Sequence, residues 1–416
     1  MKDFLKTISK EGGFIMIIFT IDLSSKEKLG FDCPKGFDED SYLRKLSVDG
    51  LKNKYPNDEE KVMERLNYEL NIICENGLSA FILVLWDCVS LAKERGIMVG
   101  PGRGTLPSSL VSNCLGVTMV DPIENNLKFE WVLRSGKDEF QEVWIDFDHT
   151  RQKEIFNYAS EKYKYDSPVL SINESFDTEC VGLVPELYII SETIKKVKEK
   201  RGKEIDIYNL KYDDPDVFGC IWDGYIDDIF FLERKGIRNF FKTMRPFSLD
   251  QLAAGIWLYP GADNMWCRKD IYRDYIEARN SKKESVLDIE AFKEITQSTY
   301  GLLLYQEQII EVFNRIGGFS LEQSNEARKS LGKRSMVEIE QNRIAFINGD
   351  KKKGISGCLA QGISAEDGVK IYFMMVDNSV YAGNKSNLLS VAMLAYQVAW
   401  LKHYYPFEYG EAFSYL

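Results

Sequence analysis

Apolar residues recur at helical spacing along most of this chain and predict a mainly helical protein. Within residues 58–76, Val62, Leu66 and Leu70 fall on one face of a helix. Residues 80–95 begin with seven consecutive apolar residues, so we expect a buried helix there. The same pattern predicts helices over residues 38–51, 150–163, 187–202, 248–258, 289–296, 303–316, 321–331, 335–348, 365–376 and 387–404.

Alternation of polar and apolar residues predicts a strand over residues 141–148. Glu142, Trp144, Asp146 and Asp148 share one face of this strand, and apolar side chains share the other. Carboxylates two residues apart on a strand can hold two divalent cations for phosphoryl transfer. The alternative is a half-exposed edge strand whose charges lie in water.

A glycine-rich turn, Val99-Gly-Pro-Gly-Arg-Gly-Thr105, follows a short apolar strand and precedes a predicted helix over residues 108–115. Gly102 and Gly104 let the backbone approach phosphate oxygens, the helix N-terminus adds a favourable dipole, and Arg103 adds a charged contact. The spacing is neither a Walker loop nor a dinucleotide-binding fingerprint, so an ordinary strand–helix turn is the alternative.

The composition of the chain excludes only a few classes of protein and of site. The 416 residues suffice for two or three domains, and the net charge of −11 argues against a coat-like nucleic-acid binder but not against a local basic groove. No run is long and apolar enough to span a membrane, and we see no secretory signal. The cysteines form no Cys-x-x-Cys pair, so we expect no zinc site.

Basic residues cluster in the C-terminal half of the chain. Such a cluster either contacts a triphosphate or a nucleic-acid backbone, or forms a solvated helix face. The cluster consists of Arg328, Lys329, Lys333, Arg334 and Arg343, followed by residues 351–353.

Taken in order, these stretches resemble the alpha subunits of bacterial DNA polymerase III, the C-family replicative polymerases. The resemblance covers about residues 42–413 and depends on the number and order of the motifs rather than on any one of them. The matching stretches are 99–105, 121–122 with 129–130, 145–151, 300–308, 332–333, 384–386 and 395–406.

The resemblance implies an α+β fold, with a palm of the beta-nucleotidyltransferase type and a large, mainly helical fingers region. It implies DNA extension with two Mg²⁺ ions, a DNA primer-template and deoxynucleotides. We expect an N-terminal lead-in over residues 1–40, containing a strand or two, a palm-like domain over 41–200 and a fingers-like region over 201–416. The family's thumb has no counterpart near residues 165–175.

The resemblance also assigns residues to phosphate contacts. The turn at residues 102–105, which holds Gly102, Arg103, Gly104 and Thr105, would face the phosphates of the incoming nucleotide. The other nucleotide-contacting candidates lie in the part that resembles the fingers. They are Arg328, Lys329, Lys333, Arg334 and Lys385.

The metal-binding carboxylates depart from the family pattern. The family's palm strand carries Asp-x-Asp directly before Phe, whereas this chain keeps Asp146 but has Trp144 at the first position. Aligning the helix over 187–202 by its apolar residues places Cys180 at the third catalytic Asp. Asp146 is therefore the one metal ligand that direct alignment retains.

A substitute carboxylate set is a further hypothesis. Asp148 lies two residues beyond Asp146, Glu142 is nearby on the strand, and Glu179 adjoins the position of the third Asp. Using this set requires the strand to slide by a full side-chain repeat. It would not restore the thumb.

Three functional hypotheses stay open. The first is a trimmed, degenerate polymerase homologue, of phage or mobile-element origin, that binds DNA or nucleotide or regulates replication. The second is an active minimal or split polymerase that uses Mg²⁺ and takes its thumb from another chain. The third is a decoy that binds host replication proteins. In each case we expect no membrane association and a place in the cytoplasm of a bacterial or phage-infected cell.

Overall fold

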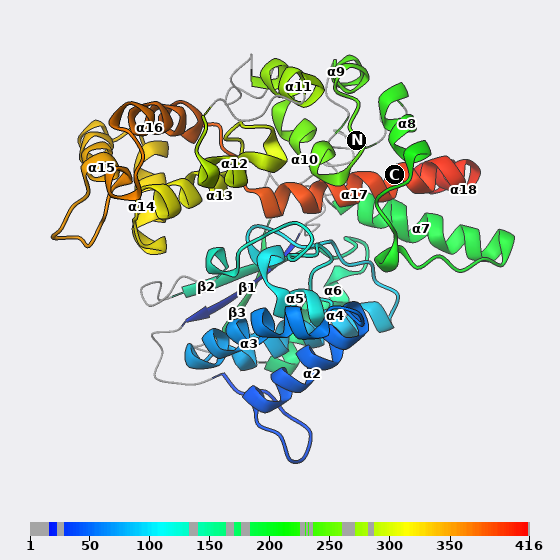
Figure 1. Ribbon diagram of the computed structural model, residues 1–416. Coiled ribbons are helices and arrows are strands. Elements are labelled where there is room, and N and C mark those ends of the chain that lie inside the picture. The colour runs from blue at the N-terminus through cyan, green and yellow to red at the C-terminus, as the bar shows by residue number, and fades with distance from the viewer. Residues whose placement is uncertain are drawn as a thin grey trace. The chain divides into compact units, whose positions relative to one another are not determined.

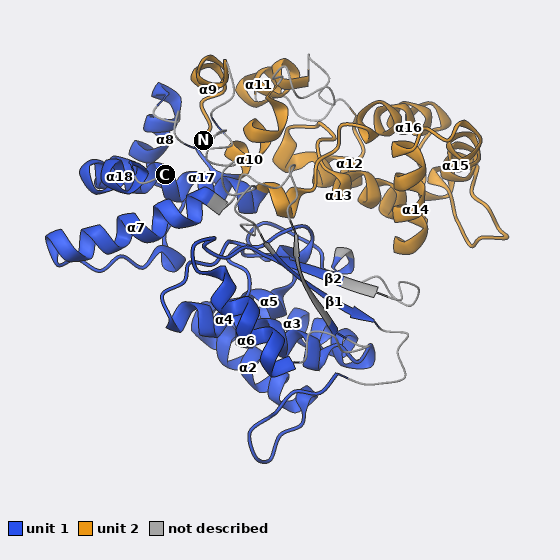
Figure 2. Ribbon diagram, turned by 180° about the vertical axis from the view of Figure 1, so that it is seen from behind, with its two compact units in different colours: residues 1–233, 247–249, 389–416 blue, residues 234–246, 250–388 orange. Residues whose placement is uncertain are grey.

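The computed structural model describes residues 16–22, 29–132, 140–163, 170–175, 184–224, 229, 232, 236–259, 271–281 and 287–414 (Figure 1). The fold is α+β and mainly helical, as predicted. The chain divides into two compact units, which we describe separately (Figure 2). Unit 1 comprises residues 1–233, 247–249 and 389–416, and unit 2 comprises residues 234–246 and 250–388.

Unit 1 contains a three-stranded antiparallel sheet in the order β2-β1-β3. The central strand β1 (Met16–Asp22) pairs with β2 (Phe140–Ile145) on one side and with β3 (Leu170–Ser175) on the other. Phe19 lies opposite Val143 in the first pair. The segment predicted as a lead-in therefore supplies the strand that joins the other two.

The alternation of side chains along β1 decides which face of the sheet is buried. Ile17, Phe19 and Ile21 are buried, whereas Ile18 and Thr20 are only half-buried. The buried side chains share one hydrophobic core with the helices that follow in the chain. These helices are α2 (Glu39–Lys54), α3 (Glu59–Glu75), α4 (Ser79–Glu94), α5 (Leu110–Cys114) and α6 (Gln152–Tyr163).

Helices near residues 184–223 and at the C-terminal end of the chain also contribute to unit 1. Arg201, at the end of α7, donates two hydrogen bonds of 2.8 and 2.7 Å to the carboxylate of Glu408 in α18. The N-terminal turn of α17 falls in unit 2, so the division passes through this helix. These helices are α7 (Val184–Arg201), α8 (Pro215–Asp223), α17 (Lys385–Tyr404) and α18 (Pro406–Phe413).

In the described part of unit 2, helices are joined by turns and loops, and no strand longer than an isolated bridge is present. Aromatic rings form the middle of its core, where Phe313 packs edge-on against Phe319, Phe346 and Tyr372. Its other helices are α9 (Ile237–Met244), α10 (Leu249–Leu258), α11 (Ile271–Ser281), α12 (Glu290–Thr296), α13 (Gln306–Glu311), α14 (Leu321–Gly332), α15 (Met336–Asn348) and α16 (Ala365–Ser379).

The division into units differs from the boundary predicted at residue 200. Residues 201–233 and 389–416 fall in unit 1 rather than with the helices of the predicted fingers-like region. The cause is packing between distant segments, because α18 lies against α7. A boundary drawn along the sequence cannot represent a unit that the chain leaves and re-enters.

Among the described residues, no single helix is long and apolar enough to cross a membrane. Helices α3 and α4 satisfy the length and composition test only when taken together, and a bend of 113° separates them.

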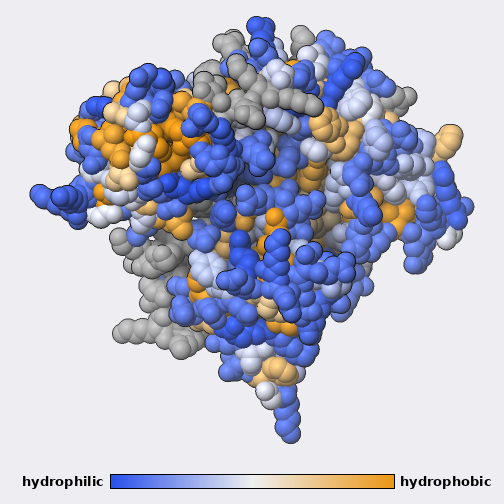
Figure 3. All heavy atoms as spheres, viewed as in Figure 1, coloured by the Kyte–Doolittle hydropathy of each residue, from blue (hydrophilic) through white to orange (hydrophobic). Residues whose placement is uncertain are grey.

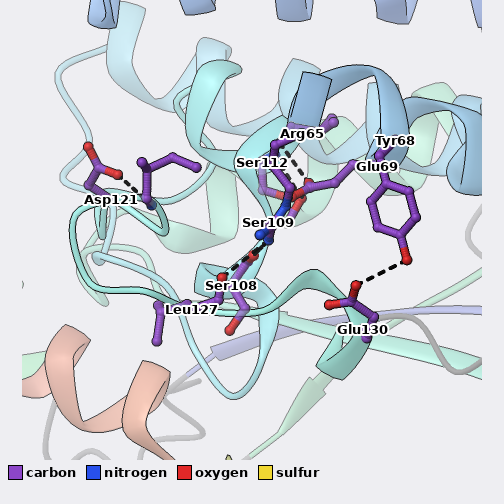
Figure 4. A network of polar contacts seen from close by, with 11 residues as sticks. Arg65, Tyr68, Glu69, Ser108, Ser109, Ser112, Asp121, Leu127 and Glu130 are labelled. Atoms are coloured by element: carbon purple, nitrogen blue, oxygen red, sulfur yellow. Dashed lines mark hydrogen bonds and ion pairs between the residues drawn. The ribbon is translucent and has the colours of Figure 1, made fainter. Parts of the chain in front are cut away.

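A buried polar network fixes the start of α5 against α3 (Figure 4). Oε2 of Glu69 accepts hydrogen bonds from the Ser109 hydroxyl at 3.0 Å and from the Val111 N–H at 3.1 Å. Oε1 of Glu69 accepts a bond of 2.6 Å from Arg65, whose guanidinium also reaches the Leu127 carbonyl. Burial raises the pKa of Glu69, and Arg65 opposes that rise.

We expect Glu69→Ala to lower the free energy of unfolding by about 3 kcal/mol, since Arg65 and the first N–H groups of α5 lose a buried acceptor. Urea denaturation monitored by circular dichroism measures this change. Glu64→Ala on the exposed side of the same helix is the control, with an expected change within about 0.5 kcal/mol. Equal effects of the two substitutions would contradict the assigned role of Glu69.

Candidate functional site

Backbone pairing brings the glycine-rich turn and the aspartate segment together in unit 1. Val99 and Phe147 form an antiparallel bridge. The Gly100 N–H donates to the Asp146 carbonyl at 2.9 Å, and the Asp148 N–H donates to the Met98 carbonyl at 2.8 Å. The two stretches that the sequence singled out are therefore neighbours, although 43 residues separate Arg103 from Asp146.

An ion pair between Arg103 and Asp146 lies at the centre of this site. Nε of Arg103 is 2.8 Å from one carboxylate oxygen of Asp146 and 3.0 Å from the other. Arg103 is 7% exposed and Asp146 is 2% exposed, so water contributes little to solvating either charge. Loss of either partner would leave the other charge buried without compensation, which lowers the stability of the fold.

The surroundings of Asp146 bear on whether it can hold a metal ion. Burial raises the pKa of its carboxyl group, and the charge of Arg103 opposes that rise. Both carboxylate oxygens already accept from the guanidinium, which is the interaction a cation would replace. In the part of the chain that the structure describes, no three His, Cys, Asp or Glu side chains converge as a ligand set for a metal ion.

The strand that carries Trp144 ends earlier than its alternation predicts. β2 stops at Ile145, so Asp146 lies beyond the strand and is buried, while Glu142 is exposed and Trp144 is half-buried. The Trp144 indole N–H donates to the Glu142 carboxylate. The predicted single face of four side chains is therefore divided between an outward pair on β2 and a buried pair after it.

Asp148 shapes the entry to α6. Its Oδ1 accepts from the Thr150 N–H at 3.0 Å and from the Thr150 hydroxyl at 2.8 Å. Asp148 is 3% exposed. Its role as a substitute metal ligand stays a prediction, as does that of Glu142. Glu179 and Cys180 lie outside the described residues.

The glycine turn has the backbone freedom that the sequence predicted. Gly102 has φ +124°, and a Cβ atom there would stand 2.8 Å from Pro107 and 3.0 Å from Thr118. The helix expected to start at residue 108 is instead a 3-10 turn, Leu106–Ser108, followed by α5. Glu69 already occupies the N-terminal N–H groups of α5, so this helix end holds an internal carboxylate.

Gly104 and Thr105 complete the turn. Gly104 has φ +56°, is exposed and has open space where a Cβ atom would be. Thr105 is half-buried, and its carbonyl accepts from the Ser108 N–H at 2.9 Å. This exposed corner is the part of the turn that solvent reaches.

A second cluster in unit 2 joins the start of α13 to the segment before α17. The Gln306 N–H donates to the Gly383 carbonyl at 2.8 Å, and the Gly383 N–H donates to the Leu304 carbonyl at 3.0 Å. Oε1 of Glu307 accepts from the Lys385 N–H at 2.8 Å. Two of the stretches matched by resemblance, residues 300–308 and 384–386, are thus in direct contact.

The predicted basic residues divide among several places in unit 2. Arg328 donates to Oε1 of Gln306 at 3.1 Å, and Nζ of Lys385 lies 3.4 Å from Oδ1 of Asp250, so both reach the neighbourhood of α13. Lys329 is half-buried on α14. Lys333 and Arg334 are exposed just after α14, and Arg334 has φ +54°.

The lysines at residues 351–353 lie at the opposite end of α14. The Gln323 side chain, in the first turn of this helix, donates to the Lys353 carbonyl at 2.9 Å. Lys333 follows the last turn, and twelve residues of helix span about 18 Å. The cluster that is nearly continuous in sequence is therefore two separate basic groups in space.

No single motif in the sequence indicates that Glu307, Asp250 and Glu69 are the centres of polar contacts. Glu307 was part of a matched stretch, but nothing in its local sequence indicates that Lys385 is its partner. A buried acidic residue on an otherwise apolar helix face is the signal that could have identified Glu69. Asp250 carries no such signal.

Two known protein families together match most of the chain. Residues 41–175 match the family described as the bacterial DNA polymerase III alpha NTPase domain. Residues 186–354 match the family described as the bacterial DNA polymerase III alpha subunit finger domain.

Curated relatives give the same result. The DNA polymerase III alpha subunit of Bacillus subtilis is 24% identical over 503 aligned residues, which cover 93% of this chain and 44% of the relative. That of Neisseria meningitidis serogroup A is 25% identical, covering 92% of this chain and 43% of the relative. The chain thus spans less than half the length of these relatives. The alignment with the Bacillus subtilis relative is 503 positions long, whereas this chain has 416 residues. That relative therefore carries residues inside the matched region that have no counterpart here.

We expect Arg103→Met to lower the free energy of unfolding by about 3 kcal/mol, because it leaves the Asp146 carboxylate buried without its partner. Asp146→Asn should cost a similar amount. The double variant should cost at least about 1 kcal/mol less than the sum of the two, because it removes both charges together.

Urea denaturation of the three variants measures this coupling. Arg151→Met is the control, since Arg151 and Glu154 form an ion pair in which each side chain is about 40% exposed, and it should cost less than about 1 kcal/mol. Additive effects of the Arg103 and Asp146 substitutions would rule out a strong buried pair.

The Glu307 carboxyl group should make stability depend on pH. Burial raises its pKa to about 7, against the opposing effects of backbone N–H groups and of Lys385. The pKa in the folded state thus exceeds the ordinary value of 4.5, so the stabilising contribution is full below that value and is lost as pH rises through about 7. We expect the wild type to lose stability relative to Glu307→Gln between about pH 5 and about pH 8.

Urea denaturation of both proteins at the two pH values measures this difference. Glu326→Gln, exposed on α14, controls for the loss of one carboxylate. A wild type that gains stability relative to Glu307→Gln as pH rises would contradict the prediction.

Proposed function

Because this chain belongs to the bacterial DNA polymerase III alpha subunit family, we propose that it is a palm-and-fingers module of DNA replication that binds nucleotide or primer-template without extending a primer by itself. The buried pair between Arg103 and Asp146 is the single observation that carries this proposal. Asp146 is the one catalytic carboxylate of the family pattern that the chain retains. In this pair it is bound to the guanidinium group of Arg103.

The Mg²⁺ chemistry of the family does not fit the described residues. Two-metal transfer needs carboxylates that bridge and space two cations. Trp144 offers an indole where the family pattern has a carboxylate, and Asp146 is committed to Arg103. Asp148 accepts from Thr150 at the start of α6. We therefore derive no catalytic step through a metal ion.

The capacity to bind anions rests on different residues. Arg328 and Lys385 both reach the start of α13, and Lys333 and Arg334 are exposed at the end of α14. Guanidinium and ammonium groups of this kind recognise phosphates by charge-assisted hydrogen bonds. In unit 1, the exposed corner at Gly104 and Thr105 adds a backbone surface to which a phosphate has access.

A split polymerase is the second candidate, favoured by one specific observation. The relatives carry residues inside the matched region that this chain lacks, and another polypeptide could contribute them. This candidate predicts activity only when the two chains are mixed. A decoy that binds host replication proteins predicts neither activity nor binding of nucleotide and primer-template.

Primer extension and binding measured on the same preparation test the proposal. We expect no extension with Mg²⁺ or Mn²⁺, together with salt-sensitive binding of a fluorescent primer-template or a deoxynucleoside triphosphate. Arg328→Gln should weaken that binding by about tenfold, as for loss of one charge-assisted contact. Arg315→Gln, which lies in the same unit and is paired with Glu294, should leave it unchanged.

The outcomes separate the alternatives. Robust extension by the chain alone, abolished by Asp146→Ala, would overturn the proposal. Extension that appears only on addition of a second chain would support the split polymerase. Loss of both extension and binding would leave the decoy hypothesis.

A further inference from the structure

Exposed hydrophobic side chains gather on unit 2 over α15 and α16 (Figure 3). Met336 and Val337, at the start of α15, are 75% and 69% exposed, and Phe373 on α16 is 52% exposed. Monomeric proteins rarely leave a contiguous apolar surface of this kind uncovered. The apolar face consists of Met336, Val337, Ile344, Leu359 and Phe373.

On α15 these residues point away from the core of unit 2. At 100° per residue, Met336, Val337 and Ile344 fall within an arc of about 100° on the helix. Phe346 lies outside that arc, and its ring packs against Phe313 in the core. The outward side of the helix therefore carries Met336, Val337 and Ile344 around the exposed carboxylate of Glu340, in addition to the apolar side that packs in the core.

The two helices lie side by side in opposite directions. The Tyr372 hydroxyl donates to the Ile339 carbonyl at 2.6 Å, and near the other end a Cβ atom on Gly368 would lie 3.7 Å from Ile347. α15 has 13 residues and α16 has 15, so both are about 20 Å long. The start of α15 is thus beside the end of α16.

The ends of the two helices carry opposite charges. Lys333 and Arg334 precede α15 and residues 351–353 follow it, all of them exposed, whereas Glu366 and Asp377 are exposed near the two ends of α16. Over residues 333–353 there are six basic and three acidic side chains, and α16 has three acidic and one basic. Within each helix some charges are already paired, Glu340 with Arg343 and Lys370 with Glu366.

We propose that the apolar face of α15 and α16 binds a second copy of this chain, with α15 of each copy lying along α16 of the other. Each copy then presents the same surface, as in the two-fold dimers that are commonest among homo-oligomers. Basic side chains that flank α15, at residues 333–334 and 351–353, then meet acidic side chains near the two ends of α16, and the two helices have similar lengths. The apolar residues of the contact differ from those proposed to bind anions, whereas Lys333 and Arg334 belong to both.

The antiparallel arrangement specifies which charges meet. A two-fold axis parallel to the helices and between them places Lys333 and Arg334 of one copy over Asp377 of the other. The same operation places residues 351–353 over Glu366. The face measures roughly 20 Å by 20 Å, or about 800 Å² over both copies, which is smaller than stable interfaces, so we expect a weak dimer that forms only at high protein concentration.

Other occupants fit this surface less well. The carboxylates of Glu366, Asp367 and Asp377 repel nucleic-acid phosphates and anionic lipid headgroups. Four of the five apolar side chains are aliphatic, so they offer bases no aromatic ring for stacking. A second copy satisfies both the acidic and the basic ends at once.

Sedimentation equilibrium of the full chain from about 1 to about 100 μM tests the proposal. We expect a monomer–dimer equilibrium that Ile344→Glu or Phe373→Glu weakens at least tenfold, because each buries a charge at the centre of the contact. Phe407→Glu is the matched control, since Phe407 is 79% exposed on α18 in unit 1. It should leave the equilibrium unchanged.

Charge reversal tests the pairing of the helices. One variant carries Lys333→Glu, Lys351→Glu and Lys352→Glu, and the other carries Glu366→Lys and Asp377→Lys. Each variant alone should be monomeric because like charges meet, whereas a mixture of the two should form a heterodimer. Circular dichroism verifies that each variant is folded.

Three results would overturn the proposal. A wild type that stays monomeric over the whole concentration range excludes the dimer. A dimer that survives both Ile344→Glu and Phe373→Glu uses another surface. Folded charge-reversal variants that stay monomeric when mixed exclude the pairing of α15 with α16.

Discussion

The buried ion pair between Arg103 and Asp146 is the constraint on which the candidate site in unit 1 depends. It joins a glycine-rich turn to the segment after β2, and because both side chains are buried, neither charge can lose its partner without leaving the other uncompensated. The backbone bonds of Gly100 and Asp148 hold the two segments in register around it. The same pair gives both carboxylate oxygens of Asp146 a cationic partner within the chain.

Helices were predictable from this sequence because their signal is local. Val62, Leu66 and Leu70 are spaced four residues apart, so the pattern that predicts the helix lies within a short stretch of sequence. As expected, α3 runs from Glu59 to Glu75. The mainly helical α+β class followed for the same reason. The central position of β1 was not predictable, because strand order depends on partners more than a hundred residues away.

The candidate site was predictable only in part, for physical reasons that particular residues illustrate. The resemblance identified both stretches that meet around Arg103, but alternation alone extended the strand past Ile145 and placed Asp146 on the same face as Trp144. A strand ends where its backbone partners end, and here a bond from Gly100 replaces the ladder. In unit 2, proximity in sequence suggested one basic cluster, whereas the length of α14 separates Lys333 from Lys353.

The position of β1 has a consequence for how the sheet can be obtained experimentally and in the cell. The match to the polymerase family begins at residue 41, so a fragment designed on that boundary would lack the strand to which β2 and β3 both bond. During synthesis, the apolar residues Ile17, Phe19 and Ile21 leave the ribosome long before either partner strand exists. Until then they lie in a short apolar segment with a high propensity to form β-structure. Segments of this kind tend to aggregate while they are unpaired. The complete sheet of unit 1 can therefore form only after residue 175 has been synthesised, because β3 ends there.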